Sequence, residues 1–328
     1  MIKKRLTLIC LLCLLFSCFS TISYSQKNDF SCKTFDTVST KIPDIIIKTV
    51  TIDHNDNLWF ATGDCFYGGL LVKYDGKDFF IYDSANSGLQ DKFVTTIFVD
   101  RQNIKWIGTR YHGVYKYDDN TWVNFSPGNC PMTNPHITSI ITDADDVFWF
   151  GTEDGLASFN GKDWMVYTSA NSGLPDNIIN AIAVDSQNNK WIATSNGFAK
   201  FDGKNWTVYN KDNSKLPNNT VNYVYVDKTG ALWVVFWSGF IRINGDNWMI
   251  YDPDHGGLPK FCDYKIVRDE NNVFWMATNN GLIRWADTGW KLYTPMNSCV
   301  VSFFVNNIAV DSKNRKWVAT NDGLMLIE

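Results

Sequence analysis

One pattern recurs along this chain at an almost constant interval: an aspartate followed six residues later by a tryptophan. The seven aspartates are Asp53, Asp100, Asp143, Asp185, Asp227, Asp269 and Asp311, and their partners are Trp59, Trp106, Trp149, Trp191, Trp233, Trp275 and Trp317. Successive tryptophans lie 47, 43, 42, 42, 42 and 42 residues apart. A period of this length in a turn-rich, aromatic-rich chain is typical of the blades of a β-propeller.

Each unit contains four short runs with the character of strands. In the fourth unit the predicted strands are 181–184, 190–194, 198–201 and 206–209. Asn196-Gly197 indicates a hairpin turn between the second and third strands, because glycine readily takes the positive φ that such turns require. No helical periodicity of any length interrupts the pattern. We therefore predict an all-β fold, a seven-bladed β-propeller of four-stranded antiparallel blades.

Tryptophans occupy a second repeated position, at the start of the fourth strand. They are Trp122, Trp164, Trp206, Trp248 and Trp290, with Phe79 in the first unit. The two positions together account for twelve of the fourteen tryptophans. Radially arranged sheets bury both faces, so we expect these aromatic side chains to belong to the core.

The two ends of the chain are predicted to share the seventh blade. The last unit stops at Glu328, after its third strand. Near the N-terminus, Phe35 and the Ile42-Pro43 pair are spaced like Tyr167 and Leu174-Pro175 of an internal unit. Residues 31–35 should therefore be the fourth strand of the seventh blade. This arrangement closes the ring and removes an open sheet edge.

Residues 1–25 have the features of an export signal: a basic start, a short apolar run and small residues before the cleavage site at Gln26. The apolar run is too short for a convincing membrane span. Residues 26–328 then form a single propeller domain, which we expect in the periplasm or outside the cell. Residues 15–18 could instead be a lipoprotein processing box, in which case a lipid on Cys18 would attach the protein to a membrane.

The net charge limits the class of partner, and the cysteine content limits the possible disulfides. The whole chain carries a net charge of −4, and removal of the three positive charges of the signal leaves −7. Nucleic acid is therefore excluded as a partner, because phosphate binding requires a basic surface. Five cysteines remain after the signal: Cys32, Cys65, Cys130, Cys262 and Cys299. Export permits disulfides, but an odd number cannot all pair within one chain, and their pairing stays open.

The stretches DSQNNKWIATSNGFAKFD and DADDVFWFGTEDGLASFN resemble the two-component-regulator propeller repeat of exported proteins and sensor ectodomains in Bacteroidetes-type bacteria. The resemblance covers the whole mature chain. It implies a seven-bladed propeller that recognises a ligand. Sensors of this family carry a membrane helix and a histidine kinase after the propeller. The present sequence has neither, so we expect a recognition module without its own kinase domain.

The repeat deviates most in the connection between the second and third strands. This connection is five residues longer in the first unit and one residue longer in the second. It lies on the face where consecutive blades are joined, which usually presents the ligand site of a propeller. In the fifth unit, Phe236-Trp237 replaces the Thr194-Ser195 pair of the fourth. The candidate ligand-binding residues are Asp64, Phe66, Tyr67, Arg110, Tyr111, His112, His136, Phe236 and Trp237.

Aromatic, guanidinium and imidazole groups around one channel mouth suit a sugar ring or an aromatic ligand. On a seven-membered ring Trp237 would face blades 1 and 2 across the channel. The alternative is that the inserts pack on each other and Trp237 covers a hydrophobic gap. Polar side chains at matched starts of the inner strands predict a ring along the channel, where we expect them to bind water. They are Lys48, Thr95, Thr138, Asn180, Asn222, Tyr264 and Asn306.

No sequence feature specifies a cofactor, a metal site or a catalytic mechanism. The turn at Asp143 faintly resembles a calcium loop, but a side chain that caps the turn explains it better. We predict an exported ligand-binding or sensing propeller, with a small molecule or carbohydrate as ligand, rather than an enzyme. One alternative is a lyase or hydrolase that uses His112, His136 and His255, for which no fixed partner residue is apparent. Another is a platform for a protein partner.

Overall fold

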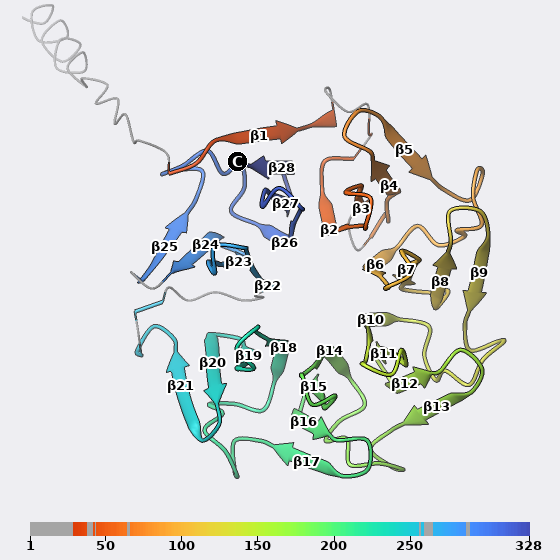
Figure 1. Ribbon diagram of the computed structural model, residues 1–328, viewed down its shortest axis with the longest axis vertical. Coiled ribbons are helices and arrows are strands. Elements are labelled where there is room, and N and C mark those ends of the chain that lie inside the picture. The colour runs from red at the N-terminus through yellow and green to blue at the C-terminus, as the bar shows by residue number, and fades with distance from the viewer. Residues whose placement is uncertain are drawn as a thin grey trace, which may run out of the picture.

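A computed structural model describes residues 29–37, 42, 44–63, 66–255, 257–258, 265–286 and 289–328. The strands form seven four-stranded antiparallel sheets arranged in a ring (Figure 1). The predicted seven-bladed propeller is therefore confirmed. In the described part of the chain, no helix is long and apolar enough to cross a membrane. The predicted signal at 1–25 and Cys18 lie outside the described residues.

Strands at equivalent positions have similar lengths in every blade. The inner strands are β2 (Ile47–Ile52), β6 (Val94–Val99), β10 (Ile137–Thr142), β14 (Ile179–Val184), β18 (Val221–Val226), β22 (Lys265–Arg268) and β26 (Val305–Val310). The second strands are β3 (Leu58–Thr62), β7 (Lys105–Thr109), β11 (Phe148–Thr152), β15 (Lys190–Thr194), β19 (Leu232–Phe236), β23 (Phe274–Thr278) and β27 (Lys316–Thr320).

The third strands are β4 (Leu71–Tyr74), β8 (Val114–Tyr117), β12 (Gly155–Phe159), β16 (Gly197–Phe201), β20 (Gly239–Asn244), β24 (Gly281–Ala286) and β28 (Gly323–Ile327). The outer strands are β5 (Phe79–Tyr82), β9 (Trp122–Phe125), β13 (Trp164–Tyr167), β17 (Trp206–Tyr209), β21 (Asn247–Tyr251), β25 (Gly289–Tyr293) and β1 (Cys32–Phe35). In the fourth blade these bounds match the predicted strands to within two residues.

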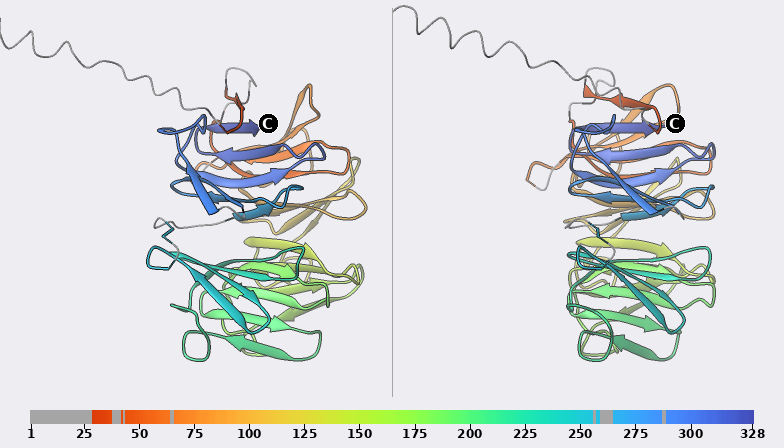
Figure 2. Two further views of the ribbon diagram at one scale, coloured as in Figure 1. Left: turned by 60° about the vertical axis from the view of Figure 1, so that its left-hand side comes forward. Right: turned by 90° about the vertical axis from the view of Figure 1, so that its left-hand side faces the viewer.

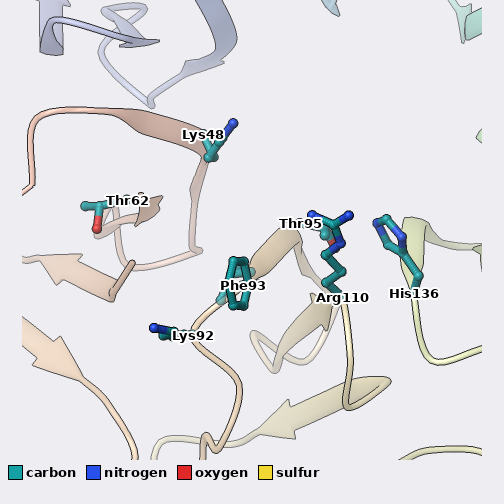
Figure 3. Close-up of a pocket in the computed structure, with 8 residues that line it drawn as sticks. Lys48, Thr62, Lys92, Phe93, Thr95, Arg110 and His136 are labelled. Atoms are coloured by element: carbon teal, nitrogen blue, oxygen red, sulfur yellow. The ribbon is translucent and has the colours of Figure 1, made fainter. Parts of the chain in front are cut away.

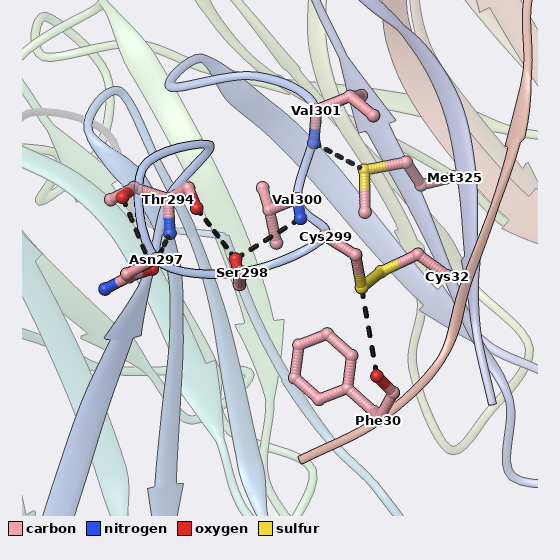
Figure 4. The surroundings of a disulfide bond; sticks show 9 residues. All are labelled: Phe30, Cys32, Thr294, Asn297, Ser298, Cys299, Val300, Val301 and Met325. Atoms are coloured by element: carbon pink, nitrogen blue, oxygen red, sulfur yellow. Dashed lines mark hydrogen bonds between the residues drawn. A yellow bond between two sulfur atoms is a disulfide. The ribbon is translucent and has the colours of Figure 1, made fainter. Parts of the chain in front are cut away.

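The seventh blade is built from both ends of the chain, as predicted. Strand β1 pairs antiparallel with β28, and Cys32 lies opposite Ile327 (Figure 1). A disulfide joins Cys32 to Cys299 in the connection between blades 6 and 7 (Figure 4). Just before β1, the carboxylate of Asp29 lies 2.6 Å from Lys291 Nζ and accepts the Tyr293 hydroxyl. The N-terminal strand is thus held to blade 6 as well as to blade 7.

The other mature cysteines do not all share this state. Cys130 is a free, half-buried thiol, and its burial raises its pKa. Cys65 and Cys262 lie outside the described residues. The pairing that the sequence left open is therefore resolved for Cys32 and Cys299, which lie 267 residues apart in the chain.

The recurring aspartate and tryptophan are directly hydrogen-bonded in every blade. The indole Nε1 of each tryptophan donates to the carboxylate six residues earlier, at 2.8–3.0 Å. In blade 1 the other oxygen of Asp53 accepts the backbone N–H groups of Asn55 and Asn57. Asp56, between them, has a φ of 63°. The interpretation of these aspartates as turn caps is confirmed.

The two tryptophan positions differ in burial. The first set is buried in every blade except the fourth, where Trp191 is partly exposed. The second set, at the outer strands, is only half-buried. Three of them, Trp122, Trp164 and Trp206, pack against aromatic residues of their own blade and of the preceding blade. Trp206, for example, lies 4.4 Å from the Phe201 ring and 5.8 Å from that of Tyr167.

Lysines at the start of some second strands connect neighbouring blades. Lys190 Nζ lies 2.8 Å from Asp143 Oδ2 in the preceding blade and 5.1 Å from the centre of the Trp149 ring. Lys316 makes the same ion pair with Asp269 at 2.9 Å. Both lysines are almost fully buried, so each charge depends on its partner in the neighbouring blade.

Candidate functional site

The connections between second and third strands lie on the same face of the ring as the connections between blades, because strand directions alternate. We call this the mouth face and the opposite one, which holds the aspartate turns, the turn face. Figure 2 shows the long β3–β4 connection of blade 1 projecting from the disc. Two residues of this insert, Phe66 and Tyr67, are 80% and 78% exposed. Asp64, a predicted site residue, lies outside the described residues.

The β7–β8 connection of blade 2 is held in place by one buried carboxylate. Asp91 Oδ2 accepts the backbone N–H of Tyr111 at 2.7 Å and lies 3.2 Å from His112 Nδ1. Its other oxygen accepts the N–H of Phe93 at 2.8 Å. Asp91 therefore ties the predicted residues of this connection to the segment that enters β6.

Two aromatic rings lie between two cations along this part of the mouth. Lys92 Nζ lies 5.6 Å from the centre of the Phe93 ring, and the Phe93 ring meets that of Tyr111 edge-to-face at 5.2 Å. The Arg110 guanidinium lies 5.4 Å from the Tyr111 ring. Tyr111 is 53% exposed, so much of its ring is available to a ligand. The four side chains form a continuous wall, which we call the blade 2 wall.

A cavity of ≈ 340 Å³ opens beside this wall, between blades 1, 2 and 3 (Figure 3). Its lining residues are Lys48, Thr62, Lys92, Phe93, Val94, Thr95, Arg110 and His136. In the view of Figure 3 Arg110 and His136 appear near Thr95, Lys48 lies on the inner strand of blade 1, and the Lys92 side chain points away from Arg110. The volume falls in the range of small-molecule sites in proteins.

A second cavity, of ≈ 430 Å³, lies toward blades 5, 6 and 7 and shares Lys48 with the first. It is lined by Lys48, Asn222, Tyr223, Lys265, Asn279, Phe304, Val305 and Asn306. Lys265 Nζ lies 4.5 Å from the centre of the Tyr223 ring, and burial raises the pKa of Tyr223 to about 12. The Tyr223 phenol is therefore neutral and can act as both donor and acceptor.

Sequence reasoning found part of this site and missed part. Four predicted residues line the first cavity: Lys48, Thr95, Arg110 and His136. Lys92 and Phe93 were missed, although they lie on a blade connection directly before an inner strand, where the mouth face is expected. Phe304 of the second cavity occupies the matching position in blade 7 and was also missed.

Phe236 and Trp237 are adjacent but have opposite environments. Trp237 is 61% exposed in the turn between β19 and β20, on the mouth face, but it does not belong to the lining of either cavity. Phe236 is fully buried and packs in the core between blades 4 and 5. The inclusion of Phe236 among ligand-contacting residues was therefore wrong, because it is the last residue of β19 and its side chain points into the core.

The predicted channel ring coincides with a β-bulge. In six blades the register of the inner strand shifts at the ring position, between Ile47 and Thr49 in blade 1 and at the equivalent places in blades 2, 3, 4, 5 and 7. A bulge leaves one residue outside the ladder and redirects its side chain. The sixth ring residue in chain order, Tyr264, lies outside the described residues.

Four side chains of the predicted channel ring form hydrogen bonds with the protein backbone. Each donates to the backbone carbonyl of the first inner-strand residue in the next blade, at 2.5–2.8 Å. The donors are Thr95, Thr138, Asn180 and Asn306. The expectation that the ring binds channel water thus overlooked its role in joining the blades, and the Asn306 bond to Ile47 closes the circle.

The three mouth-face histidines each have a carboxylate partner, which the sequence did not reveal. His112 pairs with Asp91, His136 Nδ1 lies 3.0 Å from Glu153, and His255 Nδ1 lies 2.9 Å from Asp252. Of the three, His136 alone belongs to the lining of the two cavities described above. Across the described ranges, no three or more His, Cys, Asp or Glu side chains are grouped to hold a metal ion.

Comparisons with known proteins agree with this fold. No protein-family model and no curated protein matches the chain. The extracellular domain of a putative hybrid two-component system from B. thetaiotaomicron aligns with a TM-score of 0.76 and 20% identity, over 90% of this chain and 41% of that one. A second such domain, from a putative one-component system of the same organism, aligns at 0.71 and 18%, over 92% and 40%.

Virginiamycin B lyase from Staphylococcus aureus also aligns, with a TM-score of 0.72 and 12% identity, over 91% of this chain and 99% of the lyase. All three likenesses are at low identity and show a shared fold. The present chain spans about two fifths of the two extracellular domains. The resemblance to two-component-regulator propellers is thus confirmed in architecture: this chain shares its fold with part of the extracellular domains of two such systems from B. thetaiotaomicron.

Proposed function

We propose that this protein is an exported recognition propeller that binds a carbohydrate at the mouth of its channel, beside the blade 2 wall. The observation that carries the proposal is the cavity between blades 1, 2 and 3, with the partly exposed rings of Phe93 and Tyr111 next to it. Sugar rings stack on aromatic faces, while fixed donors beside the rings bind hydroxyl groups and set orientation.

The support from related folds is coarser than the proposal. The similar structures from B. thetaiotaomicron are extracellular domains of regulatory systems, which fits a sensing role for an exported propeller. The choice of carbohydrate rests on the chemistry of the cavity alone. Phe66 and Tyr67, exposed on the neighbouring insert, would extend the contact surface for an oligosaccharide.

The test is a glycan-array screen of the purified protein, followed by calorimetry on the best ligand. We expect Tyr111→Ala to weaken that binding about tenfold or more, because hot-spot aromatic truncations commonly cost more than 1 kcal/mol. Phe80→Ala is the matched control, since Phe80 is 45% exposed on the outer strand β5, away from the mouth. Absence of any glycan ligand, or equal loss in both variants, would reject the proposal.

A further inference from the structure

We infer that the sugar bound at this mouth carries an acidic group, a carboxylate or a sulfate, which the cavity between blades 1, 2 and 3 receives. The inference rests on the proposed carbohydrate function and adds the class of sugar. The described residues that line this cavity have cationic or neutral side chains.

The cavity concentrates positive charge on an acidic protein. Lys48, Lys92 and Arg110 line it together with His136, and none of its eight described lining residues is acidic. The second cavity adds Lys265 and likewise has no acidic residue in its described lining. The chain as a whole carries a net charge of −4, so this local excess runs against the general balance. Such a concave positive region raises the local concentration of anions and stabilises them when bound.

Two carboxylates of the described residues beside the cavity are engaged in contacts with the protein. The side chain of Asp91 is 2% exposed, and its two oxygens accept the backbone N–H groups of Phe93 and Tyr111 and contact His112. Glu153 is 53% exposed and its carboxylate lies 3.0 Å from His136 Nδ1, so it orients that ring. Neither carboxylate belongs to the described lining of the cavity.

The cations that line the cavity come from separate elements. Lys48 is at the bulge of β2, Lys92 is in the connection before β6, and Arg110 follows β7. The planar guanidinium of Arg110 can hold two oxygens of a carboxylate or sulfate in parallel hydrogen bonds. The Thr95 hydroxyl donates to Ile137 O and thus keeps its proton away from the ligand. Anion binding is accordingly assigned to nitrogen donors.

The aromatic rings explain why the anion should belong to a sugar. Phe93 and Tyr111 lie between Lys92 and Arg110 in the blade 2 wall. The two ring centres are 5.2 Å apart, and each cation lies 5.4–5.6 Å from the centre of the ring next to it. A free inorganic anion would gain nothing from these rings. A uronic acid or a sulfated sugar presents an apolar ring face to the wall and its charge to the cavity.

The experiment compares paired oligosaccharides that differ in charge alone. One pair is an oligogalacturonate and its methyl ester, and the other is a sulfated glycosaminoglycan fragment and its desulfated form. Neutral glycans from the array and inorganic sulfate complete the set. Binding is measured by calorimetry at an ionic strength of about 0.1 M and again at about 1 M, where the Debye length falls from about 10 Å to about 3 Å.

We expect an acidic member to bind at least about tenfold more tightly than its neutral partner, with a loss of affinity at high salt. Arg110→Gln and Lys48→Gln should each abolish most of that preference. Lys204→Gln, an exposed lysine in the β16–β17 turn on the turn face, is the matched control and should leave it unchanged.

The outcomes separate this inference from the proposed function. Salt-insensitive binding of a neutral glycan, unchanged in Arg110→Gln, would overturn the acidic sugar and leave the carbohydrate function standing. Sulfate that binds as tightly as the acidic sugars would also overturn it, since the ring would then contribute nothing. If no glycan binds, acidic or neutral, both proposals fall together.

Discussion

The two faces of the ring differ in how much the residues at equivalent positions vary from blade to blade. On the turn face, seven aspartates accept the indole N–H of seven tryptophans at nearly the same distance. On the mouth face, equivalent positions hold residues as different as Ser195, Arg110 and Trp237. The turn face is uniform because these polar groups are buried in six of the seven blades and must be paired. Side chains on the mouth face are largely exposed, so they can vary with little effect on stability.

Removing one carboxylate from the turn face should give the largest effect on stability. Asp143→Ala removes the acceptor of Trp149 Nε1 and the partner of the buried Lys190. We expect the free energy of unfolding to fall by about 3–5 kcal/mol, because a buried charge loses its partner. Denaturant titration monitored by tryptophan fluorescence measures this loss of unfolding free energy.

The matched control for this variant is Asp154→Ala, which removes an exposed carboxylate from the β11–β12 turn on the mouth face. Its stability should change by less than about 1 kcal/mol. Equal losses in the two variants would show that the faces do not differ in the way proposed here.

The disulfide between Cys32 and Cys299, where the ring closes, allows a test of whether stability can be reduced without a change in ligand binding. Replacing both Cys32 and Cys299 with serine opens a covalent link between segments 267 residues apart. We expect a loss of about 2–4 kcal/mol in the free energy of unfolding, since the link restricts the unfolded chain. Ligand affinity at the mouth should be unchanged. Cys130→Ser, which removes the free thiol, is the control, and a comparable loss there would contradict the expectation.

A smaller effect on stability is expected when the pH is lowered, because a carboxylate of the turn face then becomes protonated. Burial alone would raise the pKa of Asp185, but hydrogen bonds from Asn189 and Trp191 outweigh it, and the pKa lies below its ordinary value of 3.8. The stability that this carboxylate contributes is fully present above about pH 4 and is lost as the pH falls through the lowered pKa.

The variant for this test is Asp185→Asn, which cannot titrate at that position. Its unfolding free energy should decline less than that of the wild type when the pH is lowered below about 4. Asp154→Asn makes the same change of charge at an exposed position on the mouth face. An acid profile of Asp185→Asn parallel to the wild type would contradict the role of the turn carboxylates.

Much of the fold could be predicted because its determinants are local and repeated. The spacing of aspartate and tryptophan reflects a single hydrogen bond that every blade repeats, so seven copies of the signal reinforce one another. The closing strand followed from the same repeat, since a unit that ends after Ile327 lacks the partner that Cys32–Phe35 supplies. The exposed positions of Phe66, Tyr67, Tyr111 and Trp237 likewise followed from their place in the unit.

The sequence alone thus determined the number of blades, their strands, the closure of the ring and the face that varies. Only the tertiary structure decided that Lys48, Lys92 and Arg110 line one cavity, that Phe236 turns inward, and that Cys32 pairs with Cys299. The physical reason is distance along the chain. Periodicity reports contacts within a blade, whereas the cavity and the disulfide join segments from different blades, brought together when the ring closes.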